Sequence, residues 1–353
     1  MQWLGLVATL GVILGGAGLF TNGVEWVGDG FGLSEGAVGS VLAAVGTALP
    51  ETVLPLIAVL LGRSAGKEIG VGAILGAPLM LTTLAMFVLG LSVLGFGRFG
   101  HRTSRIRMDA AVPTLDLAFF LGLFTLAIVA GLVRVKAFNF VLAALLVIAY
   151  AAYVRLQFRS PAGERLGREV AHVIQPLYLR RAAGAAGAAG AALRRPLQEE
   201  PSAPPMWASI VQTLVGVVVI VAGARVFVLL VTALSDRFRV PYLVFALLLA
   251  PVATELPEIF NASVIWARRG RDTLAVGNIT GAMVFQAVFP VTIGLTLTPW
   301  RLSGESLVAA LVALGAGAVL YATIRIRGEL GPRLLLLQGL IYGAFVIFVV
   351  SRL

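Results

Sequence analysis

The composition of this 353-residue chain indicates a polytopic membrane protein. It is 59% hydrophobic and only 12% charged, whereas a soluble domain carries about 25% charged residues. The chain has no cysteine, which excludes disulfides, thiolate metal sites and cysteine nucleophiles. The formal charge of +10 comes from basic residues clustered between apolar runs, a pattern of membrane orientation rather than nucleic-acid binding.

Apolar runs of about 20 residues predict an all-α protein of ten membrane-spanning helices. The first run has no basic residue before its apolar core, so we expect a retained helix rather than a cleaved signal peptide. In chain order the predicted helices are approximately 2–22, 34–61, 69–96, 110–133, 137–156, 207–235, 241–267, 273–299, 304–324 and 334–351.

The two halves of the chain form an internal repeat. A shift of 207 positions aligns 13–20 (ILGGAGLF) with 220–227 (IVAGARVF) without a gap, and it places Glu51 on Glu258. We therefore expect a first five-helix repeat over 1–156, an Arg/Ala/Gly/Pro-rich linker over 157–206 and a second repeat over 207–353.

Lysine and arginine counts predict the orientation of the helices. The loops on the linker side hold 18 of these residues, and the opposite side holds 8. We therefore expect a cytoplasmic linker, both termini outside and a location in the plasma (inner) membrane. Because each half has an odd number of helices, the second half enters from the opposite side, and the two repeats are inverted in topology.

Two similar hexapeptides each end in a glutamate within an apolar run. Residues 46–51 read GTALPE and residues 253–258 read ATELPE. A carboxylate inside a membrane span costs about 2.5–3.5 kcal/mol on insertion scales, so Glu51 and Glu258 are predicted to act together at a functional site.

Each hexapeptide carries a helix-breaking proline, Pro50 or Pro257. The next helix of each half then has a glycine pair, in 72–77 (GAILGA) and 277–282 (GNITGA). These glycines permit close backbone approach or local unwinding. Broken helices in inverted repeats are typical of secondary transporters, whose substrate sites lie near the membrane midplane.

These paired segments resemble the alpha repeats of the cation/calcium antiporter superfamily, which includes the sodium/calcium exchangers. The resemblance implies that Glu51 and Glu258 are the principal Ca²⁺ ligands, that Asn278 flanks them, and that Thr47 and Thr254 supply further oxygens. It also implies exchange of Ca²⁺, or another divalent cation, for Na⁺ or H⁺ by alternating access. In that cycle the first and sixth helices slide against the others.

The chain departs from the pattern of that superfamily at several positions. Alanines replace polar residues at Ala48, Ala73, Ala77 and Ala282, which removes candidate oxygen ligands for Na⁺, and Glu255 adds a third carboxyl group. Closely spaced carboxylates cannot all ionise. We therefore hypothesise that the counter-ion is H⁺, instead of or together with Na⁺.

Several alternatives stay open at this stage. Glu255 faces either the site or a neighbouring helix. Asp116, Gln286 and Asn261 also lie in apolar runs, where we expect them to cap or bridge helices. For Asn261, one turn beyond Glu258, the alternative is a side chain that reaches the site. A Na⁺/H⁺ exchanger on the same fold and an acid-lined cation channel are the alternative functions.

We expect a transporter and not an enzyme. The two histidines lie in predicted loops far from the glutamates, and no glycine-rich phosphate loop with its lysine is present. Inorganic cations and the lipid bilayer are the expected partners. We expect no cofactor and no nucleic acid, and the oligomeric state is open, with a monomer compatible with the sequence.

Overall fold

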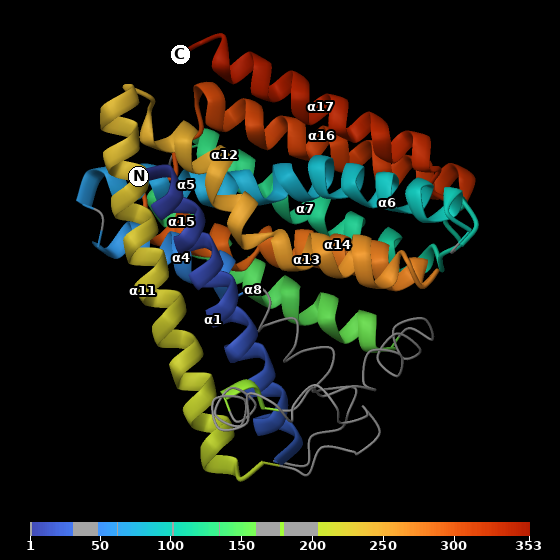
Figure 1. Ribbon diagram of the computed structural model, residues 1–353. Coiled ribbons are helices and arrows are strands. Elements are labelled where there is room, and N and C mark those ends of the chain that lie inside the picture. The colour runs from blue at the N-terminus through green and yellow to red at the C-terminus, as the bar shows by residue number, and fades with distance from the viewer. Residues whose placement is uncertain are drawn as a thin grey trace.

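The structure, a computed structural model, describes residues 2–30, 49–61, 63–100, 102–133, 135–159, 177–179 and 204–353. All regular structure within these residues is helical (Figure 1). The first half contains α1 (Gln2–Gly30), α4 (Leu49–Leu61), α5 (Arg63–Met80), α6 (Met86–Arg98), α7 (Ala111–Val133) and α8 (Lys136–Arg159). The second half contains α11 (Met206–Phe238), α12 (Tyr242–Thr254), α13 (Leu256–Phe260), α14 (Asp272–Gln286), α15 (Phe289–Leu297), α16 (Gly304–Arg327) and α17 (Pro332–Val350).

Length and composition confirm the predicted all-α membrane class. Eight helical spans of the described chain are long and apolar enough to cross a membrane, and Pro50–Leu61 and Tyr242–Val252 are shorter apolar helices. These ten segments match the ten that the hydropathy predicts. The first part of the second predicted helix, 34–48, lies outside the described residues, as does most of the predicted linker.

The contact between α1 and α11 reveals the inverted symmetry of the repeats. Gly16 of α1 packs against Ile220 of α11, and Gly223 of α11 packs against Ile13 of α1. The shift of 207 positions relates Ile13 to Ile220 and Gly16 to Gly223, so each repeat makes the same contact with the other. Residue numbers rise along one helix as they fall along the other. The two helices are therefore antiparallel, as an inverted repeat requires.

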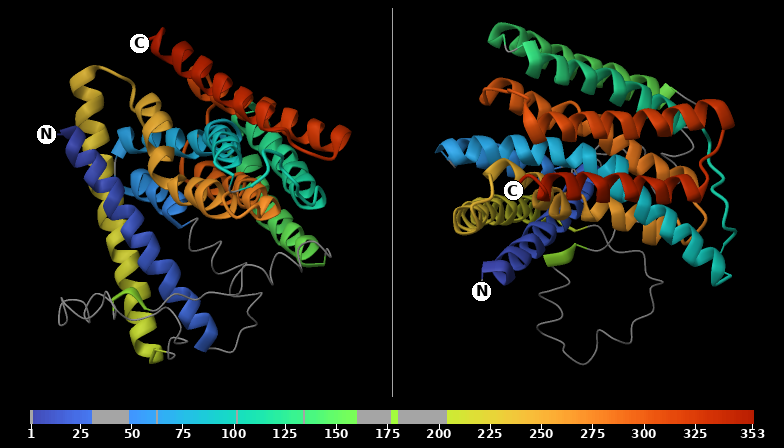
Figure 2. Two further views of the ribbon diagram at one scale, coloured as in Figure 1. Left: turned by 45° about the vertical axis from the view of Figure 1, so that its right-hand side comes forward. Right: turned by 90° about the horizontal axis from the view of Figure 1, so that it is seen from above.

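Figures 1 and 2 show α1 and α11 side by side, crossing the direction of most other helices at a steep angle. Glycines make their close approach possible. A Cβ at Gly16 would lie 2.9 Å from Val219 Cγ1 and 3.0 Å from the Ile220 nitrogen. These two helices thus form a pair that is distinct from the rest of the bundle.

The glycine pair of 72–77 serves close packing and not unwinding. Gly72 and Gly76 lie inside α5, where an added Cβ would fall 2.3 Å and 2.2 Å from the carbonyl oxygens of Leu243 and Leu247. Gly72 lies against Leu243 and Gly76 against Leu247. Residue numbers therefore rise in the same direction along α5 and α12, so these two helices are parallel. Of the two possibilities that the sequence left open, close approach is the one observed here.

The helices break near, but not at, the predicted positions. In the second repeat α12 ends at Thr254 and α13 begins at Leu256, so the break falls at Glu255, two residues before Pro257. Pro257 has no backbone N–H to continue the hydrogen bonds of α12 and is well accommodated in the first turn of a new helix. Gly277 and Gly281 lie within the uninterrupted α14.

A second pair of irregularities follows the glycine motifs. The motif of 72–77 matches that of 277–282 with a shift of 205, which places Leu81 on Gln286. α5 gives way to a π-helical segment, Leu81–Ala85, and α14 ends at Gln286. Both helices therefore lose regular α-helical geometry at equivalent positions, a feature often found at functional sites.

A buried ion pair fixes the start of α14 to the loop before α7. The Arg102 guanidinium donates hydrogen bonds from Nη1 to Asp272 Oδ1 (2.6 Å) and from Nη2 to Asp272 Oδ2 (2.9 Å). Both side chains are about 95% buried, at 5% and 4% exposure. Arg102 Nη1 also donates to the Ala267 carbonyl oxygen, at 2.7 Å. This anchor holds α14 in a set position relative to α7.

Candidate cation-binding site

Three glutamates meet where α4 approaches the break between α12 and α13. Glu51 lies in the first turn of α4, Glu255 at the break and Glu258 in α13. All three are buried, at 3%, 0% and 3% exposure. One carboxylate oxygen from each lies within 4.8 Å of the others. Of the two orientations that the sequence left open for Glu255, the structure shows the one toward the other glutamates.

Gln286, at the end of α14, joins two of these carboxyl groups. Its amide Nε2 donates hydrogen bonds to Glu51 Oε2 and, at 3.0 Å, to Glu255 Oε1. Carboxylate oxygens of Glu51, Glu255 and Glu258 lie within 4.8 Å of one another. Carboxyl groups this close cannot all ionise, so without a bound cation at least one of them carries a proton.

Gln286 is a site residue that the sequence analysis missed. We expected it to bridge helices, and it does so between α14, α4 and the α12–α13 break, but at the centre of the carboxyl cluster. The available signal was an amide within an otherwise apolar run, 281–291 (GAMVFQAVFPV). A polar side chain inside a membrane span is by itself a functional-site hypothesis.

Asn278 and Thr254 lie beside the glutamates and orient them. Asn278 Nδ2 donates to the backbone carbonyl oxygen of Glu258 at 3.1 Å. Thr254 Oγ1 lies 3.4 Å from Glu255 Oε1 and 3.4 Å from the Ala250 carbonyl oxygen. The predicted ligand Thr47 lies outside the described residues.

The remaining polar residues of the apolar runs lie elsewhere. Asp116 bridges helices as expected, since it accepts hydrogen bonds from Tyr153 of α8 and Thr280 of α14. Asn261 begins the π-helical segment Asn261–Trp266, and its side chain is outside the described part of the structure.

The donor set of the site is hard oxygen. The three glutamates offer six carboxylate oxygens, and Gln286 Oε1 and Thr254 Oγ1 are nearby neutral oxygens. Glu51 Oε1, Glu255 Oε2 and Gln286 Oε1 are buried, and no hydrogen-bond partner is found for them among the described residues. Buried polar atoms without partners are rare in native proteins. Oxygens of this kind are the ligands that Ca²⁺ prefers, in sets of six to eight.

The alanines at positions 73, 77 and 282 supply no side-chain oxygen. Ala73 and Ala77 are buried in α5, at 6% and 2% exposure, and Ala282 is half-buried in α14. None of these side chains can ligate a cation. The carboxyl cluster is therefore the principal source of ligands among the described residues.

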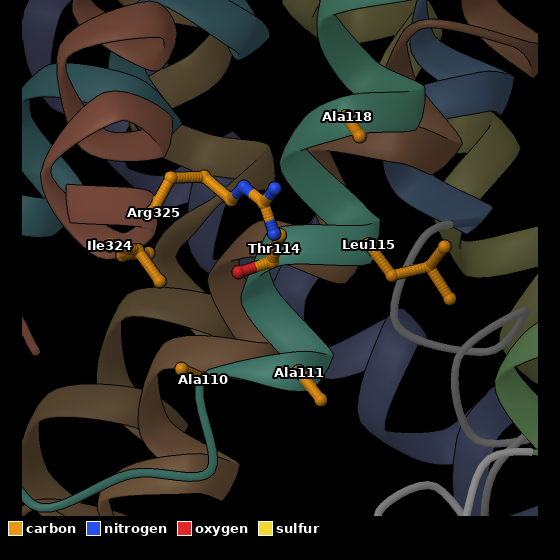
Figure 3. A pocket seen from close by; sticks show the side chains of 7 residues that line it. All are labelled: Ala110, Ala111, Thr114, Leu115, Ala118, Ile324 and Arg325. Atoms are coloured by element: carbon orange, nitrogen blue, oxygen red, sulfur yellow. The ribbon is translucent and has the colours of Figure 1, made fainter. Parts of the chain in front are cut away.

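An open groove lies away from the glutamates. It has a volume of about 450 Å³ and lies between α7 and α16 (Figure 3). Its lining contains no carboxylate and consists of Ala110, Ala111, Thr114, Leu115, Ala118, Ile324 and Arg325. An open groove lined mostly by alanine and apolar side chains offers too few oxygens for a cation, so the candidate site is the buried cluster.

Comparison with known proteins agrees with this architecture. The family model described as "Sodium/calcium exchanger protein" matches residues 1–159 and 208–351. A curated relative, the putative antiporter CaxA of Alkalimonas amylolytica, is 29% identical over 101 residues, which are 29% of this chain and 31% of that protein. The match therefore spans about a third of the relative's length.

Two solved structures share the fold. The sodium-calcium exchanger NCX_Mj superposes with a TM-score of 0.57 and 18% identity, covering 98% of this chain and 97% of the other. The H⁺/Ca²⁺ exchanger CAX superposes with a TM-score of 0.61 and 13% identity, covering 99% and 87%. The family match over most of the sequence, together with the shared fold, shows that this integral membrane protein belongs to the sodium/calcium exchanger family of the cation/calcium antiporter superfamily.

Proposed function

We propose that the protein is an antiporter that exchanges Ca²⁺ for H⁺ at the cluster of Glu51, Glu255 and Glu258. The observation that carries this proposal is the meeting of three buried carboxyl groups within 4.8 Å, with an amide between two of them. Such a cluster binds either a divalent cation or protons, because it cannot stay fully charged inside the membrane. Competition between the two for the same oxygens couples their transport.

Repeat symmetry supports different roles for the three glutamates. Glu51 and Glu258 are equivalent under the shift of 207, whereas Glu255 corresponds to Ala48. We assign Glu51 and Glu258 as the principal Ca²⁺ ligands. Glu255 is the carboxyl group that stays protonated, held by Gln286 and Thr254. Asn278 fixes Glu258 through its backbone carbonyl.

Charge balance then sets the stoichiometry. With Ca²⁺ bound, two ionised glutamates and one protonated glutamate give a neutral site. Without Ca²⁺, three protonated glutamates give a neutral site as well. Each Ca²⁺ is therefore exchanged for two protons, and the exchange moves no net charge. A site that carries neither Ca²⁺ nor protons holds unpaired carboxylates in a low-dielectric environment. Their charge opposes the change between the states open to the two sides of the membrane, and this prevents leak.

Alternating access requires that one part of the bundle move against the other. The α1–α11 pair is suited to this, because its two helices pack tightly on each other through Gly16 and Gly223. The pair crosses the rest of the bundle at a steep angle (Figure 2). We propose that α1 and α11 slide as a unit past the helices that hold the carboxyl cluster.

The proposal extends to the organisation of the chain in the membrane. Residues 1–156 and 207–353 are the two repeats, and 157–206 is a cytoplasmic linker. Both termini lie outside, and the location is the plasma (inner) membrane. A single chain carries all three glutamates, so a monomer contains the complete site.

Calcium uptake into proteoliposomes tests this function. The purified protein is given ⁴⁵Ca²⁺ under a pH gradient without Na⁺, and in parallel under a Na⁺ gradient at equal pH. Glu258→Gln is measured beside the parent, and Glu329→Gln, in the exposed loop after α16, is the control for a carboxyl-to-amide change.

We expect uptake under the pH gradient in the parent and in Glu329→Gln, and none in Glu258→Gln. Uptake under the Na⁺ gradient alone would show that Na⁺ is the counter-ion. Absence of Ca²⁺ uptake under both gradients would contradict the substrate assignment and favour a Na⁺/H⁺ exchanger, which Na⁺-dependent acidification or alkalinisation of the vesicles would then reveal.

A further inference from the structure

A second buried carboxyl group lies outside the central cluster. Asp116 is in α7 and is only 1% exposed. Its Oδ1 accepts hydrogen bonds from the Tyr153 hydroxyl at 2.9 Å and from Gln157 Nε2 at 3.3 Å. Its Oδ2 accepts from Thr280 Oγ1 at 2.6 Å. The group is thus connected to α8 on one side and to α14 on the other.

No basic side chain of the described chain pairs with Asp116, since the one ion pair found among the described residues joins Arg102 and Asp272. The titratable groups on the elements packed against Asp116 are few. α8 places Tyr150 and Tyr153 near it, and the arginines at the end of α8 are exposed. α14 has only Asp272, in its first turn, and α15 has none. α16 contributes Tyr321, Arg325 and Arg327 near its last turn. Asp116 therefore lacks a countercharge, and a proton is the species that can neutralise it.

Asp116 lies near the arginine-bearing end of α7. It is five residues into α7, about 7.5 Å from the helix start at 1.5 Å per residue. That start follows the loop that holds Arg102, Arg105 and Arg107. Its partner Thr280 precedes Gln286 by six residues of α14, about 9 Å along the axis.

Thr280 also links Asp116 to the motif that contacts the cluster. On the same helix, Asn278 donates to the carbonyl oxygen of Glu258, and Gln286 donates to Glu51 and Glu255. One helix, α14, thus carries side chains that contact both carboxyl sites, and the Arg102–Asp272 anchor keeps this helix fixed against α7.

We propose that Asp116 is a second proton-binding site of the exchanger, which takes up protons released by the central carboxyl groups and delivers them to the solution at the arginine-bearing end. This inference rests on the proposed Ca²⁺/H⁺ exchange. A central carboxylic acid that loses its proton becomes the carboxylate that binds Ca²⁺. The Asp116 carboxylate that accepts the proton becomes a neutral acid and returns to the carboxylate when it releases the proton. The same steps run in reverse for transport in the opposite direction.

The competing interpretation is that Asp116 only holds α7, α8 and α14 together. Asp116→Asn separates the two. The asparagine has almost the same volume and keeps an oxygen that accepts from Tyr153, and Thr280 can turn its hydroxyl to accept from the new amide. The change therefore removes the titratable proton and leaves most of the contacts.

The test uses two transport modes of the full-length protein in proteoliposomes. One is ⁴⁵Ca²⁺ uptake driven by a pH gradient, which needs proton transfer. The other is exchange of external ⁴⁵Ca²⁺ for internal ⁴⁰Ca²⁺ at equal pH, which needs only the central site. Asp116→Asn is compared with Asp116→Glu and with Thr125→Val, an exposed position of the same helix.

We expect Asp116→Asn to slow pH-driven uptake about tenfold or more, as loss of a positioned proton-transfer group does, and to leave Ca²⁺/Ca²⁺ exchange unchanged. Asp116→Glu keeps a carboxyl group and is expected to restore part of the pH-driven rate. An equal loss in both modes, or a loss in neither, would overturn the proposal. A parent protein that shows Ca²⁺/Ca²⁺ exchange but no pH-driven uptake would instead refute the proton coupling itself.

Discussion

The charge of Glu255 decides how the central cluster works, and Glu255→Gln tests it. Two carboxylate charges within 4.8 Å of each other repel by at least about 3.5 kcal/mol at an effective dielectric constant of 20. Without a bound cation, an ionised Glu255 beside ionised Glu51 and Glu258 would meet this repulsion twice, at least about 7 kcal/mol in total. The charge-assisted hydrogen bond from Gln286 returns only about 1.5–3 kcal/mol, so Glu255 is expected to be protonated in the empty site. We expect it to keep that proton when Ca²⁺ binds to Glu51 and Glu258 and neutralises their charges.

A glutamine has nearly the shape of a protonated glutamate and carries no charge. Glu255→Gln should therefore leave pH-driven ⁴⁵Ca²⁺ uptake active, with KM for Ca²⁺ changed by less than about tenfold, which corresponds to 1.4 kcal/mol. It should also keep the ratio of two protons per Ca²⁺. In contrast, Glu258→Gln should abolish uptake.

The assay compares initial uptake rates over a range of Ca²⁺ concentrations for the parent, Glu255→Gln and Glu258→Gln in the same lipid. Loss of uptake in Glu255→Gln equal to that in Glu258→Gln would refute the reasoning. It would mean that Glu255 is ionised and ligates Ca²⁺ directly.

Three further changes test other parts of the structure. Gln286→Leu removes the hydrogen-bond donor that joins Glu51 and Glu255. KM for Ca²⁺ should rise about 10- to 100-fold, the equivalent of one charge-assisted hydrogen bond. An unchanged KM would place the amide outside the working site. Gly16→Ala crowds the α1–α11 contact at a cost of about 1–3 kcal/mol and should slow transport while equilibrium Ca²⁺ binding persists, whereas Gly15→Ala, with nothing within 4 Å, should be silent. Asp272→Asn breaks the buried ion pair with Arg102 and should destabilise the protein by about 3–5 kcal/mol. The measurement is the Tm in detergent, which should fall. An unchanged Tm would contradict the role of this ion pair as an anchor of α14.

The sequence predicted the helices and the two repeats because hydropathy and the shift of 207 are properties of the chain alone. The equivalent positions of Glu51 and Glu258 predict that they act together. The structure places a carboxylate oxygen of each within 4.8 Å of the other, and their role as ligands stays a prediction. Glu255 could not be oriented from the sequence. The break at 254–256 puts it outside regular helical geometry, so helical periodicity gives no direction for its side chain.

Gln286 shows a different limit of sequence reasoning. Its repeat equivalent is Leu81, so symmetry did not single it out. Its role depends on where α14 ends relative to α4, a long-range packing relationship that no local pattern encodes. The glycines of 72–77 and 277–282 are compatible in sequence with either unwinding or close approach. Only the backbone distances to α12 decide for close approach in the first repeat.

The most direct test of the central claim is the number of protons moved per Ca²⁺ and its dependence on voltage. Proteoliposomes without Na⁺ are loaded with a pH-sensitive dye, and ⁴⁵Ca²⁺ uptake and internal pH are followed together at membrane potentials clamped with K⁺ and valinomycin. Exchange at a cluster that is neutral in both loaded states predicts two protons per Ca²⁺ and a rate that does not depend on the potential. A rate that follows the potential, or Ca²⁺ uptake without any change in internal pH, would contradict Ca²⁺/H⁺ exchange by the three glutamates.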